Sequence, residues 1–326
     1  MVMLGTLASF ACARTTATAQ TPAERQPAIL EVSTRGGVSL EVLDWGGSGP
    51  PLVFLAGGGS STPHDFDEFA PRFASRHRVI GITRRGIGGS STERPRSFDD
   101  YVDDIVAVLD AFHFERVVIV GHSYAGLEMA RFGEKYGRRC AALVYLDAAY
   151  DYTDPALEKI FEANRPPSPP PMRSADSASI DAVRDWSLRT QRYAAPVSAL
   201  RASRLWGQDG RLIGSKPSLV DSWNIPTPTP RWERVACASL GIYAMPTPYE
   251  TSLPWWSSLD SLQQAQAQAY YAAFAPWTKK NRETFGRLPQ NRVVEFPSAN
   301  HNFFMAKPDE AVRVIDAFLN SLKPKD

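Results

Sequence analysis

The chain has 326 residues, of which 43% are hydrophobic and 22% are charged, and its formal net charge at pH 7 is +1. This composition is typical of a globular protein with one sizeable core and an accessory layer, and it argues against intrinsic disorder. No long basic or acidic run is present, so the charge gives no case for binding nucleic acid or an anionic membrane surface. We therefore expect a small, nearly neutral molecule as the binding partner.

The first 19 residues are similar to an export signal. A short apolar stretch, residues 1–11, is followed by Ala17-Thr18-Ala19 before Gln20, which resembles the A-x-A site of a signal peptidase. No Lys or Arg precedes the apolar stretch, and the stretch is too short to span a bilayer. We predict a secreted or periplasmic protein that begins at Gln20. The alternatives are a lipid anchor at Cys12 and a cytoplasmic protein.

From residue 28 onward, strand-like and helix-like segments alternate, which predicts an α/β fold with a mostly parallel central sheet flanked by helices. Strands are predicted at Ile29–Val32, Val38–Trp45, Leu52–Leu55, Val79–Thr83 and Val117–Val120. The first two should form an antiparallel pair, and the next three have the continuous apolar character of strands that are buried on both faces. A helix is predicted over Phe98–Phe112, with Ser97 and Asp100 as a capping box at its start.

The apolar run Val117–Val120 ends in the turn Gly121-His122-Ser123-Tyr124-Ala125, and a helical pattern begins behind it. This G-x-S-x-A form resembles a nucleophile elbow, in which a strained strand-to-helix turn exposes a serine hydroxyl. The small residues two before and two after Ser123 let the neighbouring backbones approach closely. An ordinary turn is the alternative, but the flanking strand and helix favour Ser123 as a nucleophile.

After a further strand at Ala141–Leu146, the alternation stops between Tyr150 and Arg234. This stretch contains a proline cluster, several helical patterns and four Trp, and it is too long for an ordinary connection. We predict a mostly helical cap, residues 150–234, over the carboxyl ends of the strands, where open α/β sheets bind ligands. An independent interaction domain is the alternative. The core would then be built from two parts, residues 28–149 and 235–326.

The second part of the core resumes the sheet. Strands are predicted at Ala238–Ala244 and Arg292–Phe296, with a helical stretch around Leu259–Phe274 between them. A final helix opens at Pro308. His301 lies in the loop between the last strand and this helix.

Four motifs in this order make the chain, from about residue 28 to the C-terminus, similar to the α/β-hydrolases of the esterase, lipase and epoxide-hydrolase-like superfamily. The motifs are Leu55–Gly59, Arg85–Ser90, Gly121–Gly126 and Asn300-His301. The family often has His-Gly in the first motif and Asp at the start of the second, where this chain has Ala56-Gly57 and Thr83. The resemblance implies an α/β-hydrolase fold and a reaction that needs neither a metal nor an organic cofactor.

The catalytic base can be chosen by elimination. The five histidines are His64, His77, His113, His122 and His301. Only His301 follows the last strand, where a hydrolase of this architecture needs its base, and the chain order Ser, acid, His is the order that this fold uses. The imidazole would take the Ser123 proton as attack begins and return it to the leaving group.

The catalytic acid has two main candidates. Many relatives place it after the strand that follows the cap, where the first carboxylate is Glu250. Others place it after the strand that follows the elbow, which fits Asp147. We prefer Asp147, which needs only to accept a hydrogen bond from the second imidazole nitrogen. Asp151, Asp154 and Asp260 are further alternatives.

The oxyanion hole is predicted from the backbone N–H of Tyr124 and that of Gly58 or a neighbour in the run Gly57–Gly59. Neither nucleotide-binding glycine pattern is present, and no Cys/His cluster has zinc spacing. If the chain is cleaved after Ala19, Cys140 and Cys237 are the remaining cysteines. An oxidising compartment would permit their pairing, although such residues are more often plain core residues.

The sequence thus predicts a serine hydrolase that cleaves carboxylic esters of small, largely apolar substrates through an acyl-enzyme on Ser123. A Ser at the elbow disfavours epoxide opening and haloalkane dehalogenation, which in this superfamily use a carboxylate nucleophile. A lactonase and an amidase or proline-aminopeptidase-like hydrolase are the enzymatic alternatives, and a ligand-binding protein is the non-enzymatic one. The eight Trp favour an aromatic-lined pocket.

Overall fold

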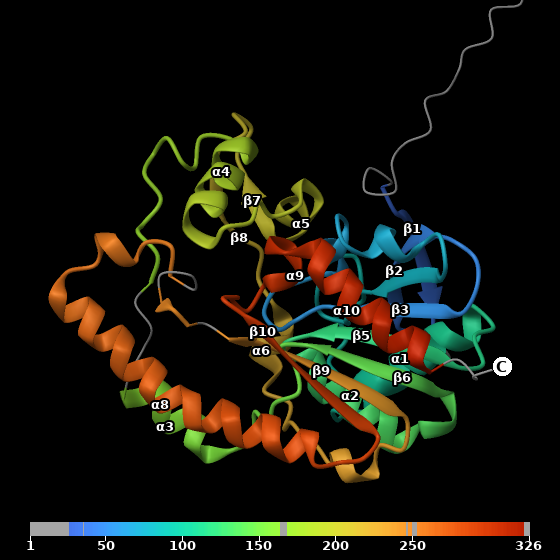
Figure 1. The fold of residues 1–326 in the computed structure, drawn as a ribbon. Coiled ribbons are helices and arrows are strands. Elements are labelled where there is room, and N and C mark those ends of the chain that lie inside the picture. Colours follow the sequence, from blue (N-terminus) through green and yellow to red (C-terminus); the bar gives the residue numbers. More distant parts are fainter. Residues whose placement is uncertain (1–25, 35, 164–167, 246, 250–252, 323–326) are drawn as a thin grey trace, which may run out of the picture.

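The computed structural model describes residues 26–34, 36–163, 168–245, 247–249 and 253–322. Its centre is an eight-stranded sheet in the order β1-β2-β4-β3-β5-β6-β9-β10 (Figure 1). The strands are β1 Ala28–Ser33, β2 Ser39–Gly46, β3 Pro51–Leu55, β4 Arg78–Ile82, β5 Val117–His122, β6 Cys140–Leu146, β9 Ala238–Met245 and β10 Asn291–Pro297. β1 and β4 pair antiparallel with β2, and the other neighbours run parallel. The predicted fold class is confirmed.

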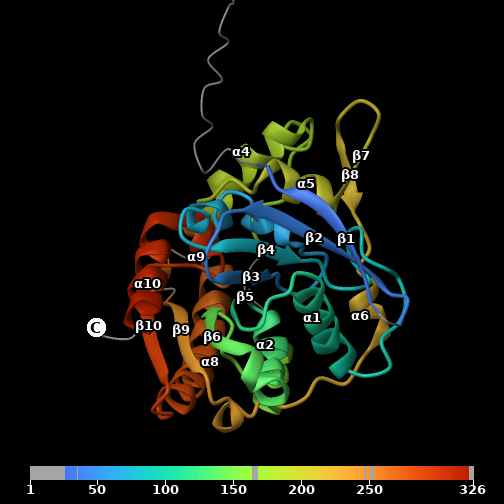
Figure 2. The ribbon, with the colours of Figure 1, turned by 90° about the vertical axis from the view of Figure 1, so that its right-hand side faces the viewer.

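Both faces of the sheet are buried, which explains the continuous apolar runs of its strands. Successive residues of β3 point into two different cores, Val53 into one and Phe54 into the other. The first core lies under α1 (Asp99–Ala111) and α2 (Ala125–Lys135), and the second lies under the turns that follow β3 and under α10 (Pro308–Ser321) (Figure 2). The two helical layers hold the sheet as a rigid frame for its loops.

The start of α1 differs from the prediction. Its N-cap residue is Phe98, without a capping side chain. The Asp100 carboxylate accepts hydrogen bonds instead from the Arg96 backbone nitrogen at 2.6 Å and from the Arg96 guanidinium at 2.9 Å. The capping-box prediction is wrong because a cation four residues earlier binds the carboxylate in a charge-assisted bond.

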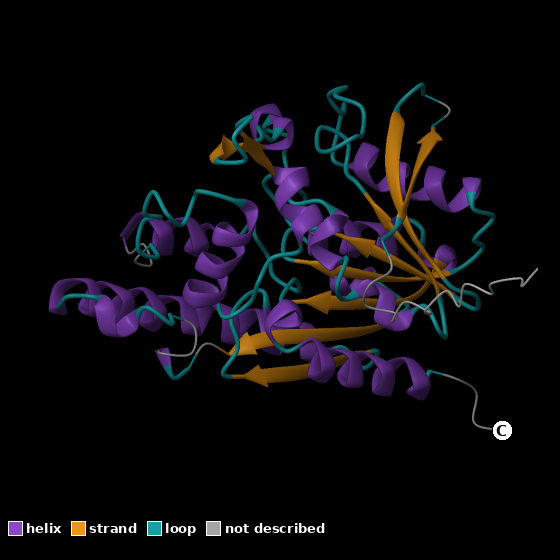
Figure 3. Ribbon diagram, turned by 90° about the horizontal axis from the view of Figure 1, so that it is seen from above, coloured by secondary structure: helices purple, strands orange, loops and turns teal. Residues whose placement is uncertain are grey.

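The insert, which we define as residues 150–234, connects β6 to β9. Its helices are α3 Pro155–Ala163, α4 Ile180–Gln191, α5 Val197–Ser203 and α6 Leu219–Trp223. It also contains an antiparallel hairpin of β7 (Arg204–Trp206) and β8 (Leu212–Ser215), which sequence analysis missed because both strands are short and partly exposed. Figure 3 shows the arrowheads of the parallel strands pointing toward the side on which the helices of the insert gather.

Helix α8 (Ser261–Gly286) is longer than expected and packs along α3 (Figure 1). It begins with a capping box between Asp260 and Gln263, and it continues through Pro276 for a further ten residues. A proline normally ends or kinks a helix. Here Trp277 and Phe285, both buried in the first core, hold the second half in place, so tertiary packing overrides the local signal.

Cys140, at the start of β6, forms a disulfide with Cys237, which directly precedes the neighbouring strand β9. The sequence left open whether these two cysteines pair or are plain core residues, and in the structure they form a disulfide.

The described helices include none with the length and hydrophobicity needed to cross a bilayer.

Candidate active site

The turn after β5 has the geometry of a strained elbow. Ser123 has a φ of +53°, and its carbonyl accepts a hydrogen bond from the Gly126 nitrogen at 2.9 Å, at the start of α2. A Cβ atom at Gly121 would collide with the Met129 sulfur, and one at Gly126 would collide with the Ala148 carbonyl. The glycines are therefore required for the close approach of β5, α2 and the segment after β6.

Asp147 follows β6, the strand beside β5, and its carboxylate is buried. One oxygen, Oδ2, lies 2.7 Å from His301 Nδ1. The other, Oδ1, accepts hydrogen bonds from the Tyr150 hydroxyl at 2.6 Å and from the Ala244 backbone nitrogen at 3.0 Å. The carboxylate is thus held from three sides and oriented toward the imidazole.

The other candidate acids are engaged elsewhere or lie outside the described residues. Asp151 accepts hydrogen bonds from the Thr153 nitrogen at 2.9 Å and hydroxyl at 2.6 Å. Asp154 pairs with Lys280 at 2.8 Å, and Asp260 caps α8. Glu250 belongs to the residues that the structure does not describe, as do the predicted export signal and Cys12.

His122, which sequence analysis assigned no role, packs its ring against that of His301, with ring centroids 4.4 Å apart. Its Nε2 lies 3.0 Å from the His301 backbone oxygen. Burial, with a smaller effect from His301, lowers the pKa of His122 well below its ordinary value. The neutral ring must therefore carry its proton on Nε2 and donate it to this carbonyl, which anchors the loop of His301.

The glycine run after β3 lies against the elbow. A Cβ atom at Gly57 would be 3.3 Å from the Ser123 Cβ, and one at Gly58 would be 3.4 Å from the Tyr124 Cβ. A side chain at Gly57 would crowd Ser123, whereas one at Gly58 would make an ordinary contact with Tyr124, so the run lets the backbone pass within contact distance of the elbow. The predicted oxyanion donors, the N–H groups of Gly58 and Tyr124, therefore belong to adjacent segments.

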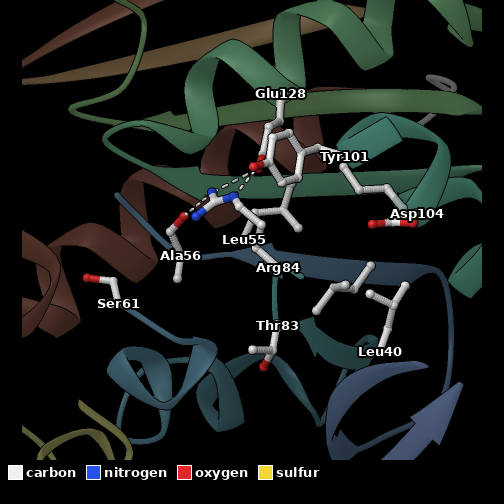
Figure 4. A pocket seen from close by; sticks show the side chains of 11 residues that line it. Leu40, Leu55, Ala56, Ser61, Thr83, Arg84, Tyr101, Asp104 and Glu128 are labelled. Atoms are coloured by element: carbon white, nitrogen blue, oxygen red, sulfur yellow. Dashed lines mark hydrogen bonds and ion pairs between the residues drawn. The ribbon is translucent and has the colours of Figure 1, made fainter. Parts of the chain in front are cut away.

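Arg84, after β4, binds the backbone at the start of this glycine run, a role that sequence analysis missed. Figure 4 shows its guanidinium between Ala56 and Glu128. Its guanidinium donates to the carbonyls of Gly57 at 2.9 Å and Ala56 at 3.1 Å, and to both oxygens of Glu128 on α2 at 2.5 and 3.0 Å. Both side chains of this ion pair are largely buried. The planar fork of Arg suits such a bridge, which ties the glycine run to the helix that follows Ser123.

Ser123, Asp147 and His301 share one cavity of about 900 Å³. Most of its lining is apolar and aromatic, and one wall is a stack of rings that runs along α8. In this wall Tyr150 stacks on Trp277, Trp277 on Phe274 and Phe274 on Tyr270, with centroid distances of 5.1, 5.3 and 5.3 Å. In the described part of the chain, His, Cys, Asp and Glu side chains form no group that could hold a metal ion.

A sequence model of the alpha/beta hydrolase family matches residues 52–314. The chain belongs to this family. Solved structures show the same fold over about nine tenths of the chain. The structure of E-2-(acetamidomethylene)succinate hydrolase covers 90% of this chain and is itself covered completely, with a TM-score of 0.57 and 20% identity. A naproxen esterase from Bacillus subtilis covers 91% of the chain and is covered to 93%, with a TM-score of 0.56 and 15% identity.

Curated relatives match a shorter stretch of this hydrolase. The bifunctional esterase/perhydrolase DCH of Acinetobacter calcoaceticus is 33% identical over 107 residues, which are 32% of this chain and 39% of the relative. Epoxide hydrolase A of Mycobacterium tuberculosis (strain ATCC 25618 / H37Rv) is 32% identical over 116 residues, 34% of this chain and 35% of the relative. The match thus spans less than two fifths of each relative, one named as an esterase/perhydrolase and the other as an epoxide hydrolase.

Proposed function

We propose that this hydrolase cleaves carboxylic esters through an acyl-enzyme on Ser123. The observation that carries the proposal is the 2.7 Å contact between His301 Nδ1 and a buried Asp147 carboxylate, in the cavity that also contains Ser123. A base that is oriented by an acid in the same cavity as a serine hydroxyl is the arrangement that acyl transfer requires.

In the proposed reaction, the Ser123 oxygen attacks the ester carbonyl carbon while His301 Nε2 takes the hydroxyl proton. Asp147 accepts the hydrogen bond from Nδ1–H, which keeps the tautomer and stabilises the imidazolium. Backbone N–H groups of Gly58 and Tyr124 donate to the oxyanion. His301 then protonates the leaving alcohol, and a water molecule, activated by the same imidazole, resolves the acyl-enzyme.

The serine at the elbow separates this proposal from epoxide opening. Epoxide hydrolases of this superfamily use a carboxylate nucleophile, and here the elbow residue is Ser123. A lactone is attacked by the same steps as an open ester, so lactone hydrolysis is the nearest alternative. Amide or proline-peptide cleavage and a ligand-binding role without turnover are further ones.

The cavity supports substrates with a bulky apolar or aromatic group. Its volume of about 900 Å³ is at the upper end of the range for small-molecule sites, roughly 300–1,000 Å³. The stacked wall of Tyr150, Trp277, Phe274 and Tyr270 offers flat apolar surface beside the proposed nucleophile. We propose that this wall binds the acyl or alcohol group of the ester.

We also propose that the hydrolase is exported. The Cys140–Cys237 disulfide supports this proposal, because disulfides persist in oxidising compartments. The A-x-A pattern at Ala17–Ala19 supports it from the sequence.

Labelling with a fluorophosphonate tests the proposal, together with panels of p-nitrophenyl esters and lactones. We expect the native chain to be labelled at once and Ser123→Ala to be neither labelled nor active. Ser168→Ala, which changes a serine of the same cavity, should keep both properties. Retention of more than about a hundredth of the activity by Ser123→Ala would overturn the assignment, since loss of a triad member costs several orders of magnitude. Slow or absent labelling of the native chain would favour the binding role.

A further inference from the structure

We propose that Arg282 determines the substrate specificity of this hydrolase by binding a carboxylate that the ester carries beside its apolar group. The inference rests on the proposed ester hydrolysis at Ser123 and names the class of ester that the site accepts. It starts from the charged side chains of the cavity that contains Ser123, because these decide which charge a ligand can bring into an otherwise apolar site.

The charge that this cavity offers to a ligand is positive. Apart from the proposed base, the charged side chains among its described lining residues are Asp147, Lys279 and Arg282. The Asp147 carboxylate already has three hydrogen-bond partners. Lys279 is 66% exposed, so water screens its ammonium, whereas the Arg282 side chain is only 16% exposed. Arg282 is therefore the charge that an enclosed ligand would meet.

Arg282 continues the aromatic wall of the cavity along α8, the long orange helix of Figure 1. Phe274, Thr278 and Arg282 follow one another at intervals of four residues, so they share one face of the helix, and all three line the cavity. At a rise of 1.5 Å per residue, Phe274 and Arg282 are about 12 Å apart along the helix. The wall thus changes from aromatic to cationic over the length of one small molecule.

The protein partners of Arg282 leave part of its guanidinium unused. Nε pairs at 2.8 Å with Glu295 on β10, whose side chain is 53% exposed. Nη1 lies 3.7 Å from the Met245 sulfur, which is a weak acceptor. A guanidinium has five N–H donors, and the described residues provide Arg282 with no further acceptor. Because a largely buried charge is costly until its donors are satisfied, an anion in the cavity would stabilise this side chain.

A carboxylate is the anion that fits this position. The planar fork of a guanidinium binds the two oxygens of a carboxylate in parallel hydrogen bonds. A phosphate group would bring close to two negative charges at pH 7, and Arg282 already shares its single positive charge with Glu295. The substrate class is therefore an ester whose apolar or aromatic body carries one free carboxylate.

The test measures how strongly the enzyme prefers a charged ester over a neutral one of the same shape. The p-nitrophenyl monoesters of adipic, pimelic and suberic acid carry the carboxylate on the acyl side, and 4-carboxyphenyl esters carry it on the alcohol side. The matching carboxamides are the neutral references, and they correct for any general loss of activity in a variant.

For the native chain, we expect kcat/KM to favour the carboxylate in at least one panel by roughly 10- to 100-fold, the size of a hydrogen bond to a charged group. Met is apolar and adaptable, so Arg282→Met removes the charge and fills much of the same space. In this variant the preference should fall to within about threefold of unity.

Two further variants separate this role from others. Lys279→Met removes the other cation of the cavity and should keep the native preference. Glu295→Gln removes the carboxylate that competes for the guanidinium, so the preference should rise roughly two- to fivefold, the size of an exposed ion pair. If Arg282 served only to hold β10 through Glu295, Arg282→Met and Glu295→Gln would lower stability alike and leave the preference unchanged. That result would overturn the proposal.

Calorimetry on Ser123→Ala measures the same contact without turnover. This variant should bind the carboxylate esters of at least one panel more tightly than their carboxamides, and adding Arg282→Met should remove the difference. A preference that survives Arg282→Met, or one that disappears in Lys279→Met, would overturn the proposal. Esters that are hydrolysed without any preference would refute the role of Arg282 alone. If the native chain hydrolyses none of these esters but the difference in binding is present, only the proposed ester hydrolysis fails.

Discussion

Replacing Asp147 by Asn is the most informative test of the proposed triad, because the structure indicates how the new side chain would sit. Oδ1 of Asp147 accepts from two donors, the Tyr150 hydroxyl and the Ala244 nitrogen, whereas the partner of Oδ2 among the described residues is His301 Nδ1. The single carbonyl oxygen of Asn satisfies both donors only in the Oδ1 position. Its NH2 group must then face His301.

This orientation imposes the wrong tautomer on the base. An NH2 group can only donate, so His301 Nδ1 must become the acceptor and the imidazole proton must move to Nε2. A protonated Nε2 cannot take the proton of Ser123. We expect kcat to fall by roughly 10³ to 10⁴, with little change in KM, as when this acid is neutralised in other triads. That loss corresponds to about 4 to 5.5 kcal/mol of transition-state stabilisation.

Steady-state kinetics with a p-nitrophenyl ester and the rate of fluorophosphonate labelling both measure this loss. Two carboxamide variants are the controls. Asp151→Asn changes a carboxylate four residues away whose partner is Thr153, and Glu250→Gln changes the alternative acid; both should keep kcat within about tenfold of native. A tenfold or smaller loss in Asp147→Asn, together with a large loss in Glu250→Gln, would refute the reasoning and move the acid to the segment after β9.

Four further predictions concern the frame of the site. Arg84→Lys keeps the charge but cannot bridge Glu128 and two carbonyls at once, so kcat should fall about tenfold and urea unfolding should show a loss of about 1–3 kcal/mol. Reducing the disulfide, or replacing Cys237 by Ser, opens a loop with a sequence separation of 97 residues and should lower the free energy of unfolding by about 2–4 kcal/mol. Burial raises the pKa of Asp65 to about 6, above its ordinary value of 3.8, so the protonated form is favoured in the folded state. The free energy of unfolding should therefore fall as pH rises from 4 to 6. Asp65→Asn should remove this decline when stability is measured by urea titration at each pH. Protein recovered from an exported fraction should begin at Gln20 by N-terminal sequencing.

Each of these predictions has a contrary outcome. Native kinetics in Arg84→Lys would mean that the glycine run keeps its geometry without the bridge. Equal unfolding curves with and without reductant would remove the disulfide from the account of stability. A decline between pH 4 and 6 that persists in Asp65→Asn would assign it to another group. Met1 on the mature protein would overturn the export proposal.

The strands, the elbow and the position of His301 could be predicted from the sequence because their signals are local. Apolar runs of four to six residues mark strands that are buried on both faces, and glycines on either side of Ser123 mark a turn that bulkier residues would block. Such signals depend only on neighbours in the chain. Where a local signal competed with packing, the prediction failed. The capping box at Asp100 is absent, and the helix expected to end near Phe274 continues through Pro276.

The contacts that shape the site depended on the tertiary structure. Asp147 was one of five candidate carboxylates, and its contact with His301, 154 residues away, exists because β6 lies between β5 and β9 in the sheet. Arg84 meets Glu128 and the glycine run only after β3, β4 and α2 have packed together. The sequence records which groups can donate or accept a proton. The order of the strands in the sheet decides which of these groups meet. That order is set by the burial of two cores, not by neighbouring residues in the chain.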